Sequence, residues 1–446
     1  MDIYKFGGTS QKDAAALDCC YNLLSVDSAP KVSVNSTIGG VTNLLFLGGQ
    51  EQIKTGLFPQ IQYQKIGQLF FEVYSAVPNS KEIIESGMED LKRRIVRGER
   101  NNLSNSTIAD FHLASLAAFG EFLNAQLFSN YLQQRKIKTI LLSPLRLKGE
   151  PLNADYDSNS NFSLQKEVRN SLAQVYVIPG YYGLNEQQQE VVFSRGGSDY
   201  TQTLIARALN AEHCFNCTDV SGIFPIDPKL LTEDSDLETL QPIPSLNYLE
   251  AQQLSYNGAK VLHPRCLRPL IDLGIPLIVL NSFAPISGAT IISSSLGNKS
   301  EIKAVTGRHQ KFSTLELMAG EMEGQRGYLA AFAQACSHLD LDTITTADAG
   351  ISATTTDEEA AVRIAVEKLQ RLGKVSYHNG AATIAIVGSH LGSDPSILAK
   401  FFNILATEKI KVNQVTKADD FSLRAVISAT DYSRAILALY HGLIIN

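Results

Sequence analysis

Ile3-Tyr4-Lys5-Phe6-Gly7-Gly8-Thr9-Ser10 runs from a short apolar strand directly into a turn with two adjacent glycines. Because glycine has no side chain, backbone N–H groups in such a turn can approach an anion closely, and Lys5 adds a positive charge beside them. Neither the G-x-x-x-x-G-K-[ST] nor the G-x-G-x-x-G pattern of common nucleotide-binding loops occurs in the chain. A double glycine after a strand is by itself more often a plain tight turn, so its meaning depends on the segments that follow.

Short apolar strands alternate with longer helical patterns through the first two-thirds of the chain. This alternation is typical of βαβ units, and it predicts an α/β fold with an open, mostly parallel sheet between layers of helices. The polar stretch Gly149–Ser163 is expected to be a surface loop. The expected strands are Ile3–Phe6, Val32–Asn35, Thr139–Leu142, Tyr176–Pro179, Val191–Phe193, His213–Thr218 and Pro276–Leu280, and the expected helices include Ala109–Leu132, Tyr200–Leu209, Tyr248–Tyr256 and Pro264–Leu273.

Beyond the serine- and glycine-containing stretch Ser293–Lys299, which is expected to be a linker, the chain repeats itself. Tyr328–Phe332 matches Ile397–Phe401, and Thr346–Asp348 matches Lys417–Asp419. Each copy has the order strand, helix, strand, strand, helix, which predicts two ferredoxin-like (βαββαβ) units that stack because neither has much core alone. The predicted domains are residues 1–298, residues 299–377 with a leading strand that the next unit can share, and residues 378–446.

The composition of the chain argues against a nucleic-acid-binding, membrane-spanning or disulfide-rich protein. The chain has 446 residues and a net charge of −6, which argues against a nucleic acid or an anionic membrane as partner. There is no run of about 18 apolar residues and no signal-peptide pattern, so we expect a cytoplasmic protein without a membrane span. The six cysteines are scattered, as is usual in a reducing compartment. Cys214 and Cys217 have the spacing of half a zinc or redox site, but without a second pair we expect buried thiols and no metal site.

A second glycine-rich turn, Ser194-Arg195-Gly196-Gly197-Ser198-Asp199, lies between a strand and the helix expected from Tyr200. The free N–H groups at a helix start bind anions readily, and the planar guanidinium of Arg195 suits a carboxylate or a phosphate. Capping of the helix by Ser198 or Asp199 is the simpler explanation, but a cap alone does not account for an arginine beside two glycines.

Glu121 is the only charged residue between Asp110 and Arg135, in a segment that otherwise reads as an apolar helix. A carboxylate buried there needs a partner, which is either an internal cation or a ligand. Thr218-Asp219 lies at the end of another expected strand, and the run from Asn257 to Pro264 supplies a further lysine between two helices. Because ligands of open α/β sheets bind at the carboxyl ends of the strands, these segments are further candidates for a site.

Taken together and in this order, the motifs resemble those of aspartate kinases in the amino acid kinase family. The matching motifs are Lys5–Ser10, Gly40-Val41-Thr42-Asn43, Gly120-Glu121, Arg195–Asp199, Thr218–Ile223 and Gly258–Pro264, and the C-terminal repeats resemble the paired ACT domains of that family. The resemblance covers the whole chain and is greatest to the monofunctional, lysine-regulated type. It implies transfer of the γ-phosphate of ATP to L-aspartate in the pathway to lysine, threonine and methionine, with Mg²⁺ held mainly through the phosphates. It also implies feedback regulation and a homodimer or larger homo-oligomer joined through the ACT domains.

The resemblance further implies a role for each matching residue. The catalytic candidates would be Lys5, which stabilises the transferring phosphate, Arg195, which clamps a substrate carboxylate, and Asp199, which arranges the reaction centre. Aspartate would be bound by Thr42, Glu121, Arg195, Gly196, Gly197 and Ser198. ATP would be held by Lys5, Phe6, Gly7, Gly8, Ser36, Thr218, Asp219, Phe224, Lys229, Lys260 and Val261. Lysine, or threonine, would bind as effector at Met322, Gly327, Tyr328, Leu329, Asp342, Thr346, Ala347 and Asp348.

The chain also departs from the family pattern. Phe224 stands where a tyrosine is usual and Lys229 where an arginine is usual, and both changes remove groups that could bind the nucleotide. A catalytically weak protein that only senses amino acids is therefore one alternative. A related kinase that acts on glutamate or acetylglutamate is another, although the paired ACT domains and the run Gly258–Pro264 favour aspartate.

Overall fold

The structure, a computed structural model, describes residues 1–158, 160–194, 196–231, 234–259, 262–295, 301–318, 327–347, 350–417 and 419–445. The chain divides into two compact units, which are described separately. The first unit comprises Met1–Ile223, Pro242–Tyr248 and Leu262–Ser295, and the second comprises Phe224–Gln241, Leu249–Val261 and Leu296–Asn446. Two internal segments therefore group with the C-terminal part of the chain, and the contiguous domain limits expected from the sequence stay a prediction.

The first unit is built on an eight-stranded sheet with the order β10-β12-β11-β9-β1-β2-β6-β3. Neighbouring strands pair in parallel except β11 and β12, which pair antiparallel. The strands of this sheet are β1 (Asp2–Phe6), β2 (Lys31–Asn35), β3 (Thr139–Leu141), β6 (Val175–Pro179), β9 (Cys214–Thr218), β10 (Ser245–Asn247), β11 (Leu277–Asn281) and β12 (Ala289–Ser293). A smaller sheet, with the order β5-β4-β7-β8, contains β4 (Leu145–Glu150), β5 (Asn153–Tyr156), β7 (Tyr182–Leu184) and β8 (Glu190–Val192).

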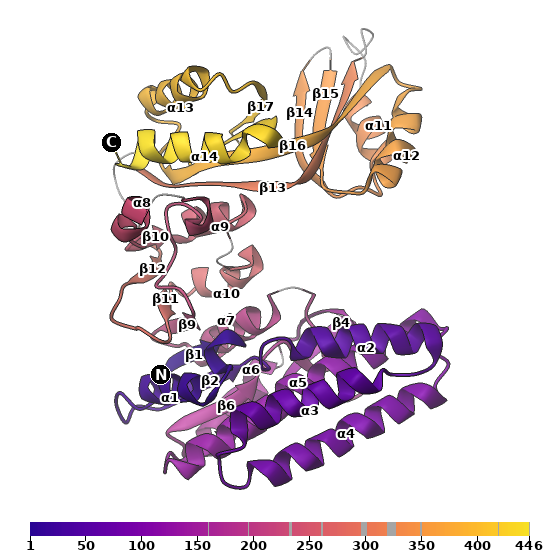
Figure 1. Ribbon diagram of the computed structural model, residues 1–446, viewed down its shortest axis with the longest axis vertical. Coiled ribbons are helices and arrows are strands. Elements are labelled where there is room, and N and C mark those ends of the chain that lie inside the picture. The colour runs from indigo at the N-terminus through magenta and orange to yellow at the C-terminus, as the bar shows by residue number, and fades with distance from the viewer. Residues whose placement is uncertain are drawn as a thin grey trace. The chain divides into compact units, whose positions relative to one another are not determined.

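The central strands of the large sheet are buried on both sides, because helices lie against both of its faces. On one face Tyr4 and Phe6 join the main core, where the Phe6 and Phe128 ring centroids lie 6.1 Å apart. From the other face Gln202 of α7 donates a hydrogen bond to the Ile3 carbonyl. Helices α3, α4 and α5 lie side by side in this unit (Figure 1). The helices are α1 (Ala14–Leu24), α2 (Val41–Thr55), α3 (Gln60–Tyr74), α4 (Ser80–Arg100), α5 (Ser106–Gln134), α6 (Ser160–Arg169), α7 (Gly197–Leu209) and α10 (Arg268–Ile271), with short 3₁₀ turns η1 (Thr9–Gln11) and η3 (Pro264–Cys266).

The long helix α5 confirms the helix predicted for Ala109–Leu132. It carries no single apolar stripe, and residues on all its sides are buried, as expected of a helix enclosed by neighbours. Its one acidic residue within this buried stretch, Glu121, is 3% exposed. No helix in the described part of the chain combines the length and apolar character needed to cross a membrane.

Two expectations for local structure are wrong. The polar stretch Gly149–Ser163 is not a loop throughout, because β4 and β5 pair as a hairpin across it and α6 begins at Ser160. A hairpin needs to bury only alternate residues, and here Ala154 is buried between polar neighbours. The helix expected over Pro264–Leu273 is replaced by the short η3 and α10. Pro269 lacks the N–H group that a continuous helix would need at that position.

The second unit contains one six-stranded antiparallel sheet with the order β14-β15-β13-β16-β18-β17. Figure 1 shows α11 and α12 at one end of this sheet and α13 and α14 at the other. The strands are β13 (Glu301–Met318), β14 (Leu341–Ala347), β15 (Gly350–Thr355), β16 (Lys374–Ser389), β17 (Val412–Thr416) and β18 (Ser422–Ser428). The helices are α8 (Asp234–Thr239), α9 (Tyr248–Tyr256, of which only Tyr248 groups with the first unit), α11 (Tyr328–Ala335), α12 (Glu359–Leu369), α13 (Pro395–Thr407) and α14 (Tyr432–Tyr440), together with η2 (Pro228–Leu230), η4 (Ala429–Asp431) and a π-helical turn, His441–Ile445.

The two central strands of this sheet each serve both sequence repeats. Residues Glu301–Arg308 of β13 pair with the C-terminal part of β16, and Ser313–Met318 pair with its N-terminal part, Lys374–Asn379, across register shifts near Phe312. The N-terminal part of β16 thus completes the first repeat, and its C-terminal part begins the second. Separate apolar cores lie under α11 and α12 and under α13 and α14. The predicted α/β fold with two C-terminal ferredoxin-like units is confirmed, with the units joined through shared strands.

The paired phenylalanines of α13 allow a test of this second core. Phe401 is fully buried, whereas the neighbouring Phe402 is 40% exposed. Truncating a buried Phe to Ala removes packing and leaves a cavity, so Phe401→Ala should lower the free energy of unfolding of this unit by about 3–5 kcal/mol. Phe402→Ala should cost about 1 kcal/mol or less. Urea unfolding followed by circular dichroism would measure both, and equal losses would contradict the assigned core.

Candidate active site

A cavity of about 300 Å³ lies in the first unit where neighbouring parallel strands end. Phe6 is aligned with Asn35, and Asn35 with Pro179, so the segments after β1, β2 and β6 leave the sheet at the same edge. The starts of α2 and α7 and the middle of α5 complete the wall. The lining residues are Gly8, Ser36, Thr37, Ile38, Gly39, Gly40, Thr42, Asn43, Glu121, Tyr181, Gly197 and Ser198.

The glycine turn after β1 approaches the turn after β2 at backbone distance. A Cβ atom added to Gly8 would lie 2.8 Å from the Gly39 nitrogen and 3.0 Å from the Thr37 carbonyl oxygen. No side chain fits there, so Gly8 is required by the close approach of the two turns. Gly40 has a φ of 89° and stands at the N-cap of α2, where its conformation starts that helix beside the cavity.

Lys5 and Asp199 form an ion pair that joins the two glycine-rich turns. The distance from Lys5 Nζ to Asp199 Oδ1 is 2.7 Å, and the side chains are 13% and 20% exposed. Burial acts to lower the pKa of Lys5, but the Asp199 carboxylate outweighs it and the pKa lies above its ordinary value. A Cβ atom on Gly7 would lie 3.5 Å from Lys5 Nζ, so the ammonium lies against the first glycine turn.

Glu121 places a buried carboxylate in the wall of the cavity. Its Oε2 atom has no hydrogen-bond partner among the described residues, and neither has the Thr37 hydroxyl oxygen. Burial raises the pKa of Glu121 to about 8, although a hydrogen bond from the Thr37 backbone, the charge of Lys5 and a hydrogen bond from Ser198 act against this. A buried acceptor without a donor is an unusual feature of a folded protein, and a cationic ligand in the cavity would satisfy it.

The second glycine turn packs closely against the segment after β6. A Cβ atom on Gly180 would lie 2.6 Å from Ser198 Oγ, and one on Gly197 would lie 2.1 Å from the Tyr181 ring. Gly196, at the N-cap of α7, has a φ of 62°. These contacts fix Ser198 at the cavity, one residue before the partner of Lys5. Arg195 lies outside the described residues.

The other residues predicted to bind the nucleotide either do not line the cavity or lie outside the described residues. Thr218 is the last residue of β9, the strand beside β1, and Asp219 follows it at the same edge of the sheet, but neither residue lines the cavity. The side chain of Phe6 is buried in the core, so only its backbone is near the turn. Phe224 and Lys229 belong to the second unit. Lys260 and Val261 lie outside the described residues.

The predicted effector residues all belong to the second unit. Gly327 caps the start of α11, which begins with Tyr328-Leu329, while Asp342, Thr346 and Ala347 lie on β14. Met322 and Asp348 lie outside the described residues. The Asp342 carboxylate pairs with two arginines, at 2.9 Å from Arg308 and 2.6 Å from Arg424. The charge predicted to bind an effector is therefore already compensated within the fold.

Sequence reasoning missed several lining residues, of which Thr37, Asn43 and Tyr181 are the clearest. Asn43 lies within the motif Gly40-Val41-Thr42-Asn43, but the resemblance assigns a role only to Thr42. Tyr181 has a φ of 66°, a backbone conformation that no sequence pattern indicates for tyrosine. A charged residue in an apolar helix was the signal that identified Glu121, whereas Asn124, one turn later, is one of several uncharged polar residues of the same helix and is not distinguished by it.

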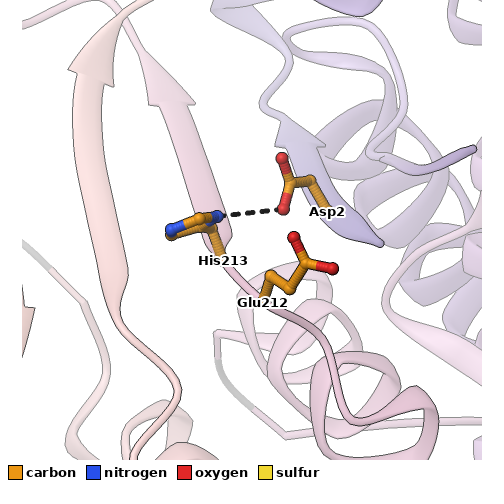
Figure 2. A group of neighbouring side chains, drawn as sticks. All are labelled: Asp2, Glu212 and His213. Carbon is orange, nitrogen blue, oxygen red and sulfur yellow. Dashed lines mark hydrogen bonds and ion pairs between the residues drawn. The ribbon is translucent and has the colours of Figure 1, made fainter. Parts of the chain in front are cut away.

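A group of possible metal ligands occurs at the opposite, amino-terminal ends of the strands. Asp2, Glu212 and His213 place their ligand atoms close together (Figure 2). The Met1 ammonium lies 3.0 Å from Glu212 Oε1, and His213 Nδ1 lies 3.1 Å from Asp2 Oδ1. Because these groups, of which Asp2 is half-buried, already interact with one another, the cluster does not point to a bound metal.

Replacing Glu121 with Gln tests the state of the buried carboxylate. In the ligand-free protein the folded state holds a proton up to pH about 8, whereas the unfolded chain releases it near the ordinary pKa of 4.5. The free energy of unfolding of the wild type should therefore fall with rising pH across this window, by up to ~1.4 kcal/mol per pH unit relative to Glu121→Gln. Urea unfolding at several pH values measures the difference, and parallel curves would show that Glu121 ionises normally.

Comparison with known proteins identifies the family to which the sequence is similar. The profile of the amino acid kinase family matches residues 3–281, and an ACT domain profile matches residues 384–443. The chain is 25% identical over 467 residues to "Aspartokinase 3" of Bacillus subtilis, covering 99% of this chain and 98% of the relative. It is 26% identical to "Lysine-sensitive aspartokinase 3" of Escherichia coli, covering 92% of each.

Solved structures share the fold. Aspartokinase III of E. coli in complex with aspartate and ADP superposes with a TM-score of 0.82 at 23% identity, covering 99% of each chain. Aspartate kinase of Clostridium acetobutylicum superposes with a TM-score of 0.84 at 22% identity, covering 99% of this chain and 100% of the other. The family profile spans the two glycine turns, the Lys5–Asp199 pair and Glu121. The chain therefore belongs to the amino acid kinase family, as its motifs predicted.

Proposed function

We propose that the protein is an aspartate kinase, which transfers the γ-phosphate of ATP to the side-chain carboxylate of L-aspartate and yields 4-phospho-L-aspartate and ADP. The observation that carries this proposal is the Glu121 carboxylate oxygen that has no hydrogen-bond partner in the described part of the chain and lies in the cavity that the glycine turn borders. It supplies a counter-charge for the ammonium of an amino acid beside a cradle suited to phosphate. The names of the relatives described above support the choice of aspartate.

The turn around Gly7 and Gly8 is suited to the triphosphate. Its glycines leave backbone N–H groups accessible, Lys5 provides the positive charge, and Ser36 borders the cavity on the other side. Lys5 is oriented by Asp199 at 2.7 Å, so its ammonium is held in place before the substrate arrives. Thr218, Asp219, Phe224, Lys229, Lys260 and Val261 stay proposed contacts of the nucleotide.

The opposite wall is suited to the amino acid. Glu121 would pair with the ammonium, and Thr42 and Ser198 offer hydroxyl groups beside it. Binding a cation there would favour the ionised form of Glu121, whose pKa is raised in the ligand-free protein. Arg195, with Gly196 and Gly197, is the proposed clamp for a carboxylate of aspartate.

The reaction needs positioning more than proton transfer. The attacking carboxylate of aspartate is already ionised at neutral pH, so no catalytic base is required. The tasks of the protein are to align this carboxylate with the phosphate and to compensate the charge that spreads over the phosphate oxygens. The Asp199 carboxylate already pairs with Lys5. We therefore expect a Mg²⁺ ion to be held mainly through the nucleotide phosphates and not by this carboxylate. When bound, that ion would neutralise part of the phosphate charge.

We also propose feedback control through the C-terminal repeats, with lysine or threonine as effector and a homodimer as the assembly. One of the relatives is named lysine-sensitive, and the repeats carry the ACT profile. The ion pairs of Asp342 with Arg308 and Arg424 would have to rearrange if Asp342 binds the amine of an effector.

The cytoplasm is the proposed location, supported by six cysteines that are all free.

A hydroxamate assay with ATP, Mg²⁺ and aspartate tests the proposed reaction. Lys5→Met keeps most of the side-chain volume and removes the charge, so kcat should fall by orders of magnitude, about 10²–10³-fold. Lys12→Met changes an exposed lysine and should leave kcat unchanged. If the wild-type enzyme forms no product at millimolar aspartate but reacts with glutamate or acetylglutamate, the substrate is that related amino acid and the proposal of aspartate is wrong. Amino-acid binding without any turnover would support a regulatory protein instead.

The two glycines of the first turn allow a matched comparison. Gly8→Ala would place its Cβ 2.8 Å from the Gly39 nitrogen and should separate the two turns. Gly7→Ala meets no atom nearer than Lys5 Nζ at 3.5 Å. We expect kcat/KM for ATP to fall about 100-fold in Gly8→Ala and far less in Gly7→Ala. Steady-state kinetics at saturating aspartate would measure both, and a larger loss in Gly7→Ala would contradict the close-approach argument.

A further inference from the structure

We propose that Gln11 and Asn124 are positioning residues for phosphate transfer, because their side-chain amides hold the turn at Gly7 and the turn at Ser36 in fixed relation. The inference rests on the proposed function for its chemistry and on a buried hydrogen-bond network for its geometry. Neither residue lines the cavity, so both would act through the backbone of the residues that do.

Gln11 connects the ends of two adjacent strands. Its Nε2 group donates to the Phe6 carbonyl at 3.1 Å and to the Ser36 carbonyl at 3.1 Å, with a longer contact of 3.4 Å to the Gly7 carbonyl. The Ser36 N–H in turn donates to the Phe6 carbonyl at 3.1 Å. One side chain therefore bridges β1 and β2 at the point where both strands turn toward the cavity.

Asn124 adds the central helix to the same point. Its Nδ2 group donates to the Ser36 carbonyl at 2.6 Å and to Gln11 Oε1 at 3.0 Å. Asn124 follows Glu121 by one turn of α5, so the two side chains project from the same face of the helix. The helix that carries the proposed ammonium partner is thereby tied to the backbone of the proposed phosphate site.

An outer layer of polar groups fixes the orientation of both amides. Tyr74 donates from its hydroxyl to Asn124 Oδ1 at 2.9 Å, Asn35 Nδ2 donates to Gln11 Oε1 at 2.7 Å, and Ser33 Oγ donates to Asn35 Oδ1 at 2.8 Å. All five side chains are completely buried, and each makes hydrogen bonds within the network.

Apolar side chains of similar size would fill this space without the need for such complete pairing. What the amides supply is direction, because a hydrogen bond fixes a carbonyl group where an apolar contact does not. The Ser36 carbonyl accepts from both Gln11 and Asn124, which leaves its peptide little freedom to rotate. Since a misplacement of about 1 Å can slow an enzyme about 100-fold, this constraint is large enough to matter for catalysis.

The same helix provides a control. Asn130 is also a buried amide of α5, and its Nδ2 group donates to the Pro78 carbonyl at 2.7 Å and to Ser80 Oγ at 3.1 Å, which are not part of the cavity wall. Asn124→Leu and Asn130→Leu thus remove equivalent groups from one helix. Only the first change removes a hydrogen-bond donor to the Ser36 carbonyl.

The experiment compares both variants with wild type by steady-state kinetics and by amide hydrogen exchange of residues 36–40 without ligand. Asn124→Leu should lower kcat about 100-fold, with a smaller change in KM for ATP, and should speed exchange in that segment. Asn130→Leu should lower thermal stability only. Gln11→Met is the second variant in case Asn124→Leu does not fold, and the double variant should lose little beyond either single one because both act on the same carbonyl.

The outcomes separate the two proposals. Loss of stability in Asn124→Leu and Gln11→Met, with kcat and exchange of residues 36–40 unchanged, would overturn the positioning role and leave the kinase proposal intact. If the wild type phosphorylates no amino acid, the proposed function fails, and the exchange data still decide whether the network holds the turn.

Discussion

The ion pair between Lys5 and Asp199 is the interaction on which the arrangement of the site depends. Lys5 belongs to β1 and Asp199 to the first turn of α7, so the pair connects the two glycine-rich turns across one face of the sheet. Removing either partner would leave the other charge largely buried and uncompensated, which is far more costly than losing an exposed ion pair. Glu121, whose pKa is raised, lies in the cavity beside this ion pair. The close approach of Gly8 to Gly39 is part of the same cavity wall.

The site motifs could be predicted because they break the local pattern. A charge in an apolar helix, as at Glu121, or two glycines after a strand, as at Gly7 and Gly8, is visible in the sequence without knowledge of the fold. The parallel sheet followed from the alternation of strands and helices. The order of the strands and the depth of the cavity could not be derived, because both depend on contacts between segments far apart in the chain.

The missed residues show where such reasoning ends. Gln11, Asn35 and Asn124 are ordinary polar residues in sequence, and only the fold places their amides within hydrogen-bond distance of one another. The segments that join the C-terminal unit, Phe224–Gln241 and Leu249–Val261, carry no boundary signal because their partners are distant in sequence. In that unit, the family resemblance predicted an effector role for Asp342 but could not reveal that Arg308 and Arg424 pair with it, since the three residues lie on β14, β13 and β18.

The long strands β13 and β16 have a consequence for how the C-terminal unit can be divided. The repeat boundary at residues 377 and 378 falls inside β16, and β13 contributes to both apolar cores through its two halves. A cut at that boundary would divide β16 and leave the whole of β13 on the first fragment, so each fragment would expose unpaired backbone groups where its partner strand is missing, an arrangement that promotes aggregation. The repeats are therefore inseparable as folding units, and any distortion of one must be carried along continuous strands into the other.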